Sequence, residues 1–305
     1  MEILIDLSKN GKRLDKVLVK EFTNLSRSQI EHLIKKEGVI INTQKILKPS
    51  YKLKGGEMVL INWDLEPKTL QPNPEIKLNI LFENDDFMVI NKQPNLSVHP
   101  LRVIDMNTLV NGLLSYYPEI RDVGEDLMRP GIVHRLDKDT SGVMLVAKNN
   151  DSFMELKEMF KKHSIQKTYV TLVYGKMKNM EGEIRAPIAK SEQKFNRRKV
   201  SFQNPNKSLM AITNYKVLKE FKETSLLEVL PLTGRTHQIR VHLASLSNFV
   251  IGDKEYGSSK INKDFPIEGQ FLHAKKLEFV WKGQNMTFEA DLPENLQKCL
   301  NYVSL

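Results

Sequence analysis

The sequence contains a single cysteine, Cys299, in 305 residues. One cysteine excludes an internal disulfide bond and any zinc site that needs several cysteines, and it is typical of a reducing compartment. No apolar run approaches the roughly 18 residues of a membrane-spanning helix, and the opening MEILIDLSKNGKRL lacks the apolar core of a secretory signal. We therefore expect a cytoplasmic protein without a membrane-spanning segment.

Several catalytic signatures are absent as well. The sequence has no GxSxG, Walker A, GxGxxG or HExxH pattern, which argues against the enzyme classes that these patterns mark. HRLDKDTSG at 134–142 is superficially similar to a kinase catalytic loop, but the glycine-rich loop and DFG segment of kinases are missing. No metal-ligand spacing is found among His134, His237, His242 and His273. We therefore expect no metal and no cofactor.

Basic residues outnumber acidic ones, and the excess is uneven. The net charge is +9. Residues 161–200 carry eleven Lys and Arg against three Asp and Glu, and residues 1–64 carry twelve against eight. Two separate basic regions are what binding to a polyanion requires. Solvated lysines on an ordinary surface explain the same charge equally well, so charge alone leaves both interpretations open.

A proline-containing stretch divides the chain. EPKTLQPNP at 66–74 separates two patterned regions, and 305 residues exceed what one average domain needs. We predict a first domain at 1–65, a linker at 66–78 and a second domain at 79–305.

The first domain is predicted to contain two helices followed by strands. Apolar residues fall on one stripe of a helix at 13–22. Ser26 has capping-box spacing for a second helix, which Gly38 is well placed to end. Residues 39–42 and 57–62 have the composition of strands.

The second domain is dominated by short strands. We predict strands at 81–83, 87–91, 142–148, 168–174, 226–230 and 271–279, and helices at 108–116, 151–163 and 236–246. Because strands and helices do not alternate regularly, this order favours an α+β fold with a mixed sheet over a doubly wound fold.

The segment RPGIVHRLDKDTSGVMLVAK, residues 129–148, is the densest in chemical groups. A Thr-Ser-Gly turn is expected ahead of its apolar strand, and loops flanked by strands hold polar groups in fixed positions. Arg135 and Lys138 lie beside Asp137 in the sequence and favour its ionised form. From these residues alone, Asp137 is either a catalytic carboxylate or a turn residue paired with its cationic neighbours.

With the strand that follows it, HRLDKDTSG resembles the signature of the large-subunit pseudouridine synthases of the RluA/RluC/RluD group. Three further blocks resemble the other motifs of that family, in the family's order: VINKQPNLSVHP at 89–100, QKTYVTLVYG at 166–175 and LTGRTHQIRVHLASLSNFVIGDKEYG at 232–257. The resemblance spans about residues 79–280. Ahead of it, residues 12–62 resemble the S4 RNA-binding module.

This resemblance implies an α+β protein in which a small S4-like RNA-binding domain precedes a pseudouridine synthase catalytic domain, built on a mixed β-sheet with flanking helices. It implies an enzyme that isomerises specific uridines, in large-subunit (23S-type) ribosomal RNA or its precursor, without a cofactor. We expect a monomer that needs no protein partner. Two departures from the family pattern are Thr171, where alanine is usual, and Ser247–Phe249.

The main alternative is a catalytically silent RNA-binding or ribosome-assembly factor of the same fold. Release of tritium from C5 of labelled uridine would distinguish the two.

The resemblance also implies roles for single residues. Asp137 is the nucleophile, attacking either the uracil or C1′, and Arg240 makes a two-pronged contact that holds it ionised. Tyr169 stacks on the uracil and serves, directly or through water, as the base for the C5 proton. Spacing alone would leave Arg240 as a helix-surface arginine, on one helical face with His237, and Tyr169 as a core tyrosine. Arg135 is expected to fill the space vacated by the flipped base. The expected substrate- and RNA-binding residues are His134, Arg135, Lys12, Arg13, Arg27, Lys35, Lys36, Arg197 and Arg198.

Overall fold

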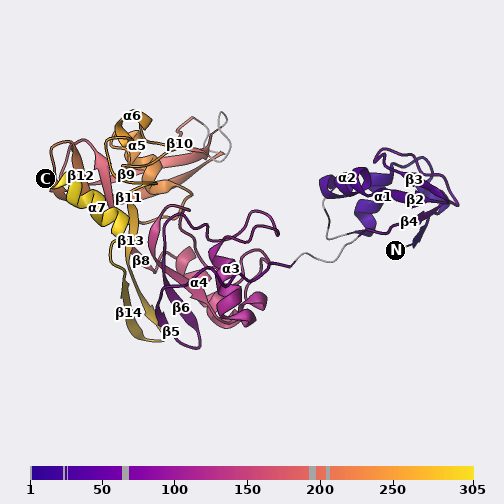
Figure 1. The fold of residues 1–305 in the computed structure, drawn as a ribbon, viewed down its shortest axis with the longest axis horizontal. Helices are drawn as coiled ribbons and strands as arrows, with labels where there is room; N and C mark the ends of the chain where they lie inside the picture. The colour runs from indigo at the N-terminus through magenta and orange to yellow at the C-terminus, as the bar shows by residue number, and fades with distance from the viewer. Residues whose placement is uncertain (1, 23–24, 26, 64–68, 192–196, 204–206) are drawn as a thin grey trace. The chain divides into compact units, whose positions relative to one another are not determined.

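The computed structural model describes the chain except for residues 1, 23–24, 26, 64–68, 192–196 and 204–206. The chain forms two compact units, residues 1–67 and 68–305 (Figure 1). The expected helix cap at Ser26 lies outside the described residues. Within the described part of the chain, no helix is both long enough and apolar enough to cross a membrane.

The first unit combines two helices with a small antiparallel sheet. The helices are α1 (Leu14–Glu21) and α2 (Arg27–Lys36), preceded by a 3-10 turn, η1 (Leu7–Lys9). In the order of the sheet, the strands are β1 (Glu2–Leu4), β4 (Met58–Leu60), β2 (Val39–Ile41) and β3 (Gln44–Ile46). The predicted helices and the strands β2 and β4 are confirmed. The sequence did not predict β1 and β3, in which two of the three side chains of each strand are exposed.

One apolar core joins the helices of this unit to its sheet. Leu14 of α1, Ile30 of α2 and Val59 of β4 are fully buried within it. Gly38 ends α2 as predicted: its φ is +77°, and its N–H donates to Ile34 O at 3.0 Å. A left-handed residue at this position is the usual way for a helix to end at glycine.

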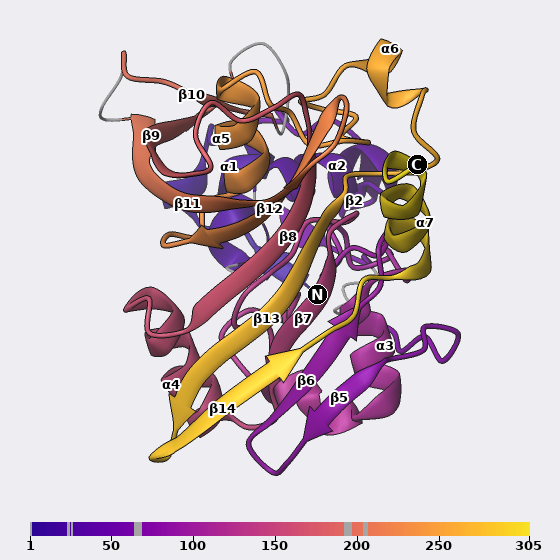
Figure 2. The same cartoon turned by 90° about the vertical axis from the view of Figure 1, so that its left-hand side faces the viewer.

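A ten-stranded mixed sheet forms the centre of the second unit (Figure 2). From edge to edge its strands are β10 (Arg198–Val200), β9 (Glu181–Lys190), β11 (Ser208–Glu220), β12 (Thr224–Pro231), β8 (Gln166–Tyr174), β13 (Leu272–Trp281), β7 (Ser141–Ala147), β6 (Phe87–Lys92) and β5 (Ile80–Glu83), and β14 (Gln284–Glu289) pairs with β13. These pairs are antiparallel except for β13 with β7, which run parallel. The predicted α+β class with a mixed sheet is therefore confirmed.

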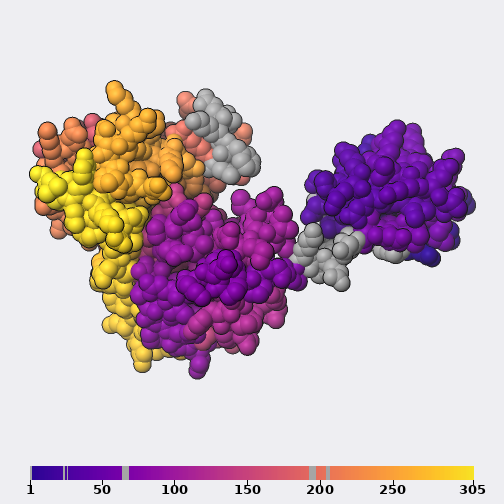
Figure 3. All heavy atoms as spheres, viewed as in Figure 1, coloured from indigo at the N-terminus to yellow at the C-terminus, as the bar shows by residue number. Residues whose placement is uncertain are grey.

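Helices accompany both ends of this sheet. The end with β5, β6 and β7 is accompanied by α3 (Leu109–Tyr116), η2 (Pro118–Asp122) and α4 (Asn150–Lys161), whereas α5 (Gln238–Ser245) packs against β9 to β12. The last helices are α6 (Ser259–Asn262) and α7 (Glu294–Val303). In the space-filling view, α6 and α7 occupy a different part of the surface from β5, β6 and α3 (Figure 3). Tyr169 on β8 packs against both of the large apolar cores of this unit.

The strand β7 brings the segment at 129–140 to the middle of the sheet. All seven residues of β7 are buried, which its nearly continuous apolar composition requires. Gly142 lies in this strand as predicted, whereas Ser141, expected in the turn, begins it, because Ser141 and Gly142 pair with His273 and Ala274 of β13. A Cβ at Gly142 would lie 2.2 Å from Ala274 O, so only glycine permits this approach of the two backbones.

Candidate active site

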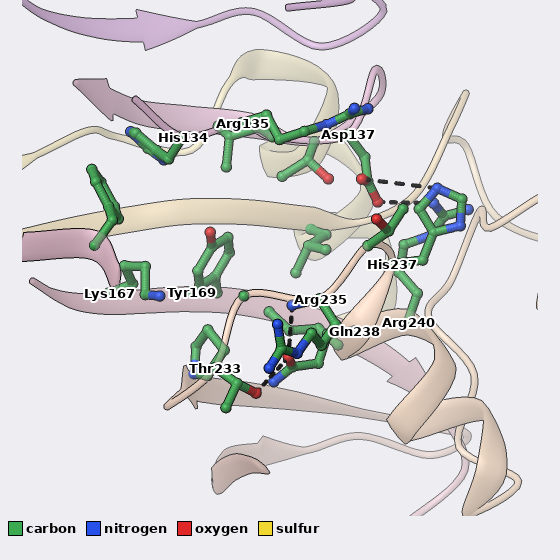
Figure 4. A pocket seen from close by; sticks show the side chains of 18 of the residues that line it. His134, Arg135, Asp137, Lys167, Tyr169, Thr233, Arg235, His237, Gln238 and Arg240 are labelled. Atoms are coloured by element: carbon green, nitrogen blue, oxygen red, sulfur yellow. Dashed lines mark hydrogen bonds and ion pairs between the residues drawn. The ribbon is translucent and has the colours of Figure 1, made fainter. Parts of the chain in front are cut away.

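A cavity of about 520 Å³ opens in the second unit where several segments meet. Besides the end of α4 and Leu272 of β13, they include the loop at 133–140 ahead of β7, the strand β8, and the segment at 231–240 that leads from β12 into α5. Asp137, Tyr169 and Arg240 come from these segments in that order, and all three line the cavity (Figure 4). The volume lies in the range typical of small-molecule sites. The fold thus brings together three residues that are far apart in the sequence.

Asp137 lies on the cavity wall with 18% of its side chain exposed. Its Oδ2 accepts a hydrogen bond from Arg240 Nη1 at 2.9 Å. Its Oδ1 lies 3.9 Å from His237 Nε2, which is too far for a hydrogen bond. One carboxylate oxygen is therefore held by an arginine, while the other leaves room for a substrate atom.

A buried lysine fixes the backbone beside Asp137. Lys92 on β6 is 1% exposed, and its Nζ donates to the carbonyl oxygens of Leu96 and Lys138 at 2.9 and 3.1 Å. Burial lowers the pKa of Lys92 to about 7, although the charges of Asp137 and Asp139 oppose the shift. Lys92 was not among the predicted residues, and its only signal is its place in the first family-like block.

Arg240 on α5 is 5% exposed and contacts three carboxylates. Its Nε and Nη2 bind the two oxygens of Asp253 at 2.7 and 2.9 Å, and Nη2 also binds Glu255 Oε2 at 2.7 Å. The expected contact with Asp137 is present, but the two-pronged contact is made with Asp253, because Asp253 faces the Nε–Nη2 edge of the guanidinium. Burial alone would lower the pKa of Arg240, but Asp253 and Asp137 raise it above its ordinary value, so the charge is permanent.

His237 lies beside Asp137, but it is not on the helical face that the sequence suggested. The helix α5 begins at Gln238, and His237 precedes it in a left-handed conformation with φ +57°. Few non-glycine residues adopt this conformation. Its Nδ1 lies 2.9 Å from Tyr256 Oη, and burial lowers its pKa. A neutral imidazole therefore borders the cavity.

Tyr169 lies on β8, two residues after Lys167 and on the same face of the strand. Burial raises the pKa of Tyr169, and the charge of Asp137 raises it further, so the hydroxyl stays protonated at neutral pH. Burial lowers the pKa of Lys167. Lys167 also lines the cavity and was not predicted, although its two-residue spacing from Tyr169 on a strand was a usable signal.

His134 lines the cavity, but its ring is fixed to the protein. Its Nε2 accepts a hydrogen bond from Leu145 N–H at 2.8 Å, and the ring stacks on Phe160 with centroids 4.3 Å apart. Burial lowers the pKa of His134 to about 3, so the ring is neutral. Arg135 is exposed in contrast, and its Nη1 lies 3.2 Å from His99 Nε2.

Gln238 fixes the beginning of α5 and was not predicted. Its Oε1 accepts hydrogen bonds from Thr233 Oγ1 and Arg235 N–H at 2.7 and 3.0 Å (Figure 4). Its Nε2 donates to Ile212 O at 2.9 Å. These contacts join α5 to β11. They hold the helix that carries Arg240 at a fixed position relative to the sheet.

The arginines expected to bind RNA in the first unit are engaged with a buried carboxylate. Asp15 accepts hydrogen bonds from Arg13 Nε at 2.9 Å and from Arg27 Nη2 at 2.6 Å. The contact with Arg13 holds the pKa of Asp15 well below its usual range. Removal of either arginine would weaken the packing of this unit, because Asp15 has no exposed surface.

The remaining predicted RNA-binding residues lie on the surface of the first unit or beside Tyr256. The three predicted lysines of the first unit are exposed: Lys12, Lys35 and Lys36. In the second unit, Arg197 lies over the Tyr256 ring, 5.1 Å from its centroid, and Arg198 N–H donates to Tyr256 Oη at 2.8 Å. The two arginines are therefore close to the tyrosine that contacts His237.

The two departures from the family pattern are accommodated locally. Thr171 Oγ1 donates to Phe271 O at 2.7 Å, so its hydroxyl is satisfied in the core. Asn248 Nδ2 donates to Tyr174 O at 2.9 Å, and Phe249 stacks on the Tyr174 ring. None of these residues lines the cavity.

Comparisons with known proteins show which family the chain is similar to. Residues 86–245 match the model of the family described as RNA pseudouridylate synthase, and residues 12–59 match that of the S4 domain. The solved structure of human RNA pseudouridylate synthase domain containing 1 is similar, with a TM-score of 0.59 and 27% identity over 73% of this chain and 87% of that chain. The resemblances inferred from the sequence are confirmed.

Full-length relatives cover nearly the whole chain. An uncharacterized RNA pseudouridine synthase of Aquifex aeolicus is 39% identical, over 96% of this chain and 94% of its own length. Two relatives are named ribosomal large subunit pseudouridine synthase D. The one from Zymomonas mobilis is 35% identical over 94% of this chain and 92% of its own length. The one from Yersinia pestis is 37% identical over 96% of this chain and 91% of its own length. The chain belongs to the RNA pseudouridylate synthase family.

Proposed function

We propose that this pseudouridine synthase modifies a uridine of large-subunit ribosomal RNA and that Asp137 is its nucleophile. The relatives named for the large ribosomal subunit and the S4 unit at the N-terminus support this substrate. Exposed lysines on the first unit suit contacts with phosphate, which position RNA without reading its sequence. The expected monomer, free of an obligatory protein partner, stays a prediction.

The chemistry of the isomerisation needs few groups. The C1′–N1 bond breaks, the uracil turns, a C1′–C5 bond forms, and the proton on C5 leaves. No electrons are gained or lost overall, and no external group is transferred. A single carboxylate in line with the nucleotide is therefore sufficient as the nucleophile.

The observation that carries the proposal is the way in which the Asp137 carboxylate is held in the cavity. Arg240 Nη1 holds Oδ2 at 2.9 Å, and Oδ1 faces His237 Nε2 across 3.9 Å inside a cavity of about 520 Å³. A charge-assisted hydrogen bond from a permanent cation at one oxygen holds the carboxylate in a fixed orientation. We propose that Oδ1 forms the bond to the nucleotide.

Tyr169 is proposed to stack on the uracil and to take part in removing the C5 proton. Its raised pKa favours a protonated phenol, so we propose that the proton passes to solvent through water that the hydroxyl orients. Lys167 lies on the same strand face and lines the cavity, and burial lowers its pKa.

Arg135 is proposed to occupy the space that the flipped uridine leaves in the RNA. Its side chain lines the cavity and is exposed. A planar guanidinium can stack on neighbouring bases and form hydrogen bonds with them. His134 is fixed to Leu145 and Phe160, so we propose that it contacts the nucleotide only through its ring surface.

Chemical mapping of pseudouridine in total RNA, with and without the gene, tests the substrate. We expect one or a few large-subunit positions to lose pseudouridine without the gene and to regain it with the wild-type gene, but not with an Asp137→Asn copy. Loss confined to transfer RNA would contradict the proposed substrate while leaving the enzyme class intact.

A further inference from the structure

His237 lies at the cavity wall and has no assigned role in the reaction. It lines the cavity, 13% of its side chain is exposed, and its backbone has the uncommon left-handed conformation. Uncommon backbone conformations in non-glycine residues are often kept at functional sites. The contacts of its two ring nitrogens indicate what the imidazole can do.

Tyr256 determines which nitrogen of His237 carries the proton. Tyr256 Oη accepts a hydrogen bond from Arg198 N–H at 2.8 Å and lies 2.9 Å from His237 Nδ1. A phenol has one proton to donate, and the amide of Arg198 can only donate. With the Arg198 amide on one lone pair of Oη, the Tyr256 proton is free to be donated to Nδ1. A neutral His237 with an accepting Nδ1 carries its own proton on Nε2.

The charged groups around His237 are compatible with a neutral ring. Asp137, Asp253 and Glu255 favour the protonated form, whereas burial, which is the largest influence, and Arg240 lower the pKa of His237. Glu255 Oε2 lies 3.3 Å from Nδ1, farther than the Tyr256 hydroxyl, and it already accepts a hydrogen bond from Arg240 Nη2 at 2.7 Å. Arg240 thus neutralises the carboxylate that would otherwise attract a proton to Nδ1.

The Nε2–H of His237 is directed toward the reacting side of Asp137. Nε2 lies 3.9 Å from Asp137 Oδ1, so it makes no hydrogen bond with the carboxylate and can donate to a substrate atom between them. Attack of a carboxylate on C6, or cleavage of the C1′–N1 bond, moves an electron pair into the uracil ring. In both cases a uracil carbonyl oxygen gains negative charge.

We propose that His237 is a further catalytic residue, a neutral imidazole whose Nε2–H donates to a charged carbonyl oxygen of the uracil, and that Tyr256 is the positioning residue that holds this tautomer. A donor fixed in advance where charge develops stabilises the transition state more than the ground state. The proposal rests on Asp137 as the reacting carboxylate. It also makes the Arg198 backbone the first donor in a chain that ends at the substrate.

The tautomer can be measured on the full-length protein without RNA. Nitrogen-15 NMR of histidine-labelled protein distinguishes protonated from unprotonated ring nitrogens. Two histidines provide internal references: His99 Nδ1 lies 3.1 Å from Pro100 O and must carry its proton there, whereas His242 Nε2 lies 3.1 Å from Ala186 O. We expect His237 to match His242 in the wild type and to become a mixture of tautomers in Tyr256→Phe.

Kinetics test the contribution of the Nε2–H to the reaction. Removing one donor from an oxyanion-type site costs about 10²–10³ in rate. Under single turnover, we expect His237→Leu to lose a factor of this size with little change in RNA affinity. His237→Gln keeps a side-chain N–H and should recover part of the rate. Tyr256→Phe should fall between wild type and His237→Leu, while the control Tyr174→Phe, which removes a hydroxyl outside the cavity, should match wild type.

Two results would overturn the proposal: a proton on Nδ1 of His237 in the wild type, or a wild-type rate for His237→Leu. Unchanged reference signals from His99 and His242 in each variant would show that the catalytic unit is still folded. Turnover by Asp137→Asn would refute the proposed nucleophile instead, and it would leave the tautomer measurement unaffected.

Discussion

Arg240 connects the carboxylate in the cavity with a second carboxylate behind it. Asp137 is held by one nitrogen, whereas Asp253, which is fully buried, takes the two-pronged contact and also accepts N–H groups of its own turn. Asp253 therefore fixes the plane of the guanidinium, and the guanidinium fixes Asp137. Planarity is the property that distinguishes arginine from lysine at such a position.

Replacing Arg240 with lysine should lower the rate although the charge is kept. A lysine ammonium cannot bind both oxygens of Asp253 and still reach Asp137 in a fixed geometry. We expect at least a roughly tenfold loss in single-turnover rate, equivalent to about 1.4 kcal/mol of transition-state stabilisation. Arg185→Lys on the exposed face of β9 is the matched control and should have no effect. A near wild-type rate for Arg240→Lys would mean that the two-pronged contact with Asp253 is not needed.

Replacing Tyr169 with phenylalanine separates stacking from proton transfer. The ring and its packing against both cores are kept, and only the hydroxyl is lost. If the hydroxyl orients the proton-accepting water, tritium release from C5 should slow by about 10²–10⁴, while RNA affinity stays nearly unchanged. Normal tritium release would leave Tyr169 with a packing and stacking role only.

The parallel pairing of β7 with β13 is the element-scale feature that places the Asp137 loop. Gly142→Ala puts a methyl group against the Ala274 carbonyl at a φ of +114°, so the strands must separate. We expect a loss of more than about 1 kcal/mol in the free energy of unfolding, measured by urea denaturation, and a lower rate because the loop moves. Gly283, the site of the control Gly283→Ala, also has a positive φ, +81°, but a Cβ there would meet open space. This control should lower the free energy of unfolding less than Gly142→Ala does. An equal loss would mean that backbone strain alone decides the effect.

The sequence predicted those elements whose patterns are local. The hairpin of β5 and β6, the helices α3 and α4, and the apolar strand β7 all lie where their composition placed them. The strands β9 and β11 were not predicted. Pro187 interrupts the pattern of β9, and the buried face of β11 includes Thr213 and Tyr215 beside Ala211. Their pairing with each other depends on residues far apart in the chain, which no local pattern reveals.

The residues of the site also differ in how far the sequence could predict them. Asp137, Tyr169 and Arg240 could be predicted because each lies in a block with family-like spacing. Lys92 and Asp253 lie in such blocks as well, but they were not singled out, because their partners, the Lys138 carbonyl and the Arg240 guanidinium, come close only in the folded chain. The left-handed His237 likewise depends on how α5 begins, which the expected helix at 236–246 placed two residues too early.

The first unit has its own core and a set of exposed lysines, so its removal should affect RNA binding more than catalysis. Deleting residues 1–67 removes phosphate contacts. We therefore expect weaker binding with a smaller dependence of log Kd on log salt concentration. Conversion of a short loop-containing RNA should persist at a reduced rate. An unchanged affinity and salt slope would mean that this unit does not touch the substrate.

The most direct test of the whole account is tritium release from C5-labelled ribosomal RNA by wild-type protein and by Asp137→Asn, under single turnover and in excess EDTA. Asparagine keeps the shape of the side chain and can still contact Arg240, but it is not a nucleophile. We predict full release by the wild type, none by the variant, and equal RNA affinity for both. Release by a variant preparation free of wild-type enzyme would contradict the assignment of Asp137, and strong inhibition of the wild type by EDTA would contradict a reaction that needs no metal.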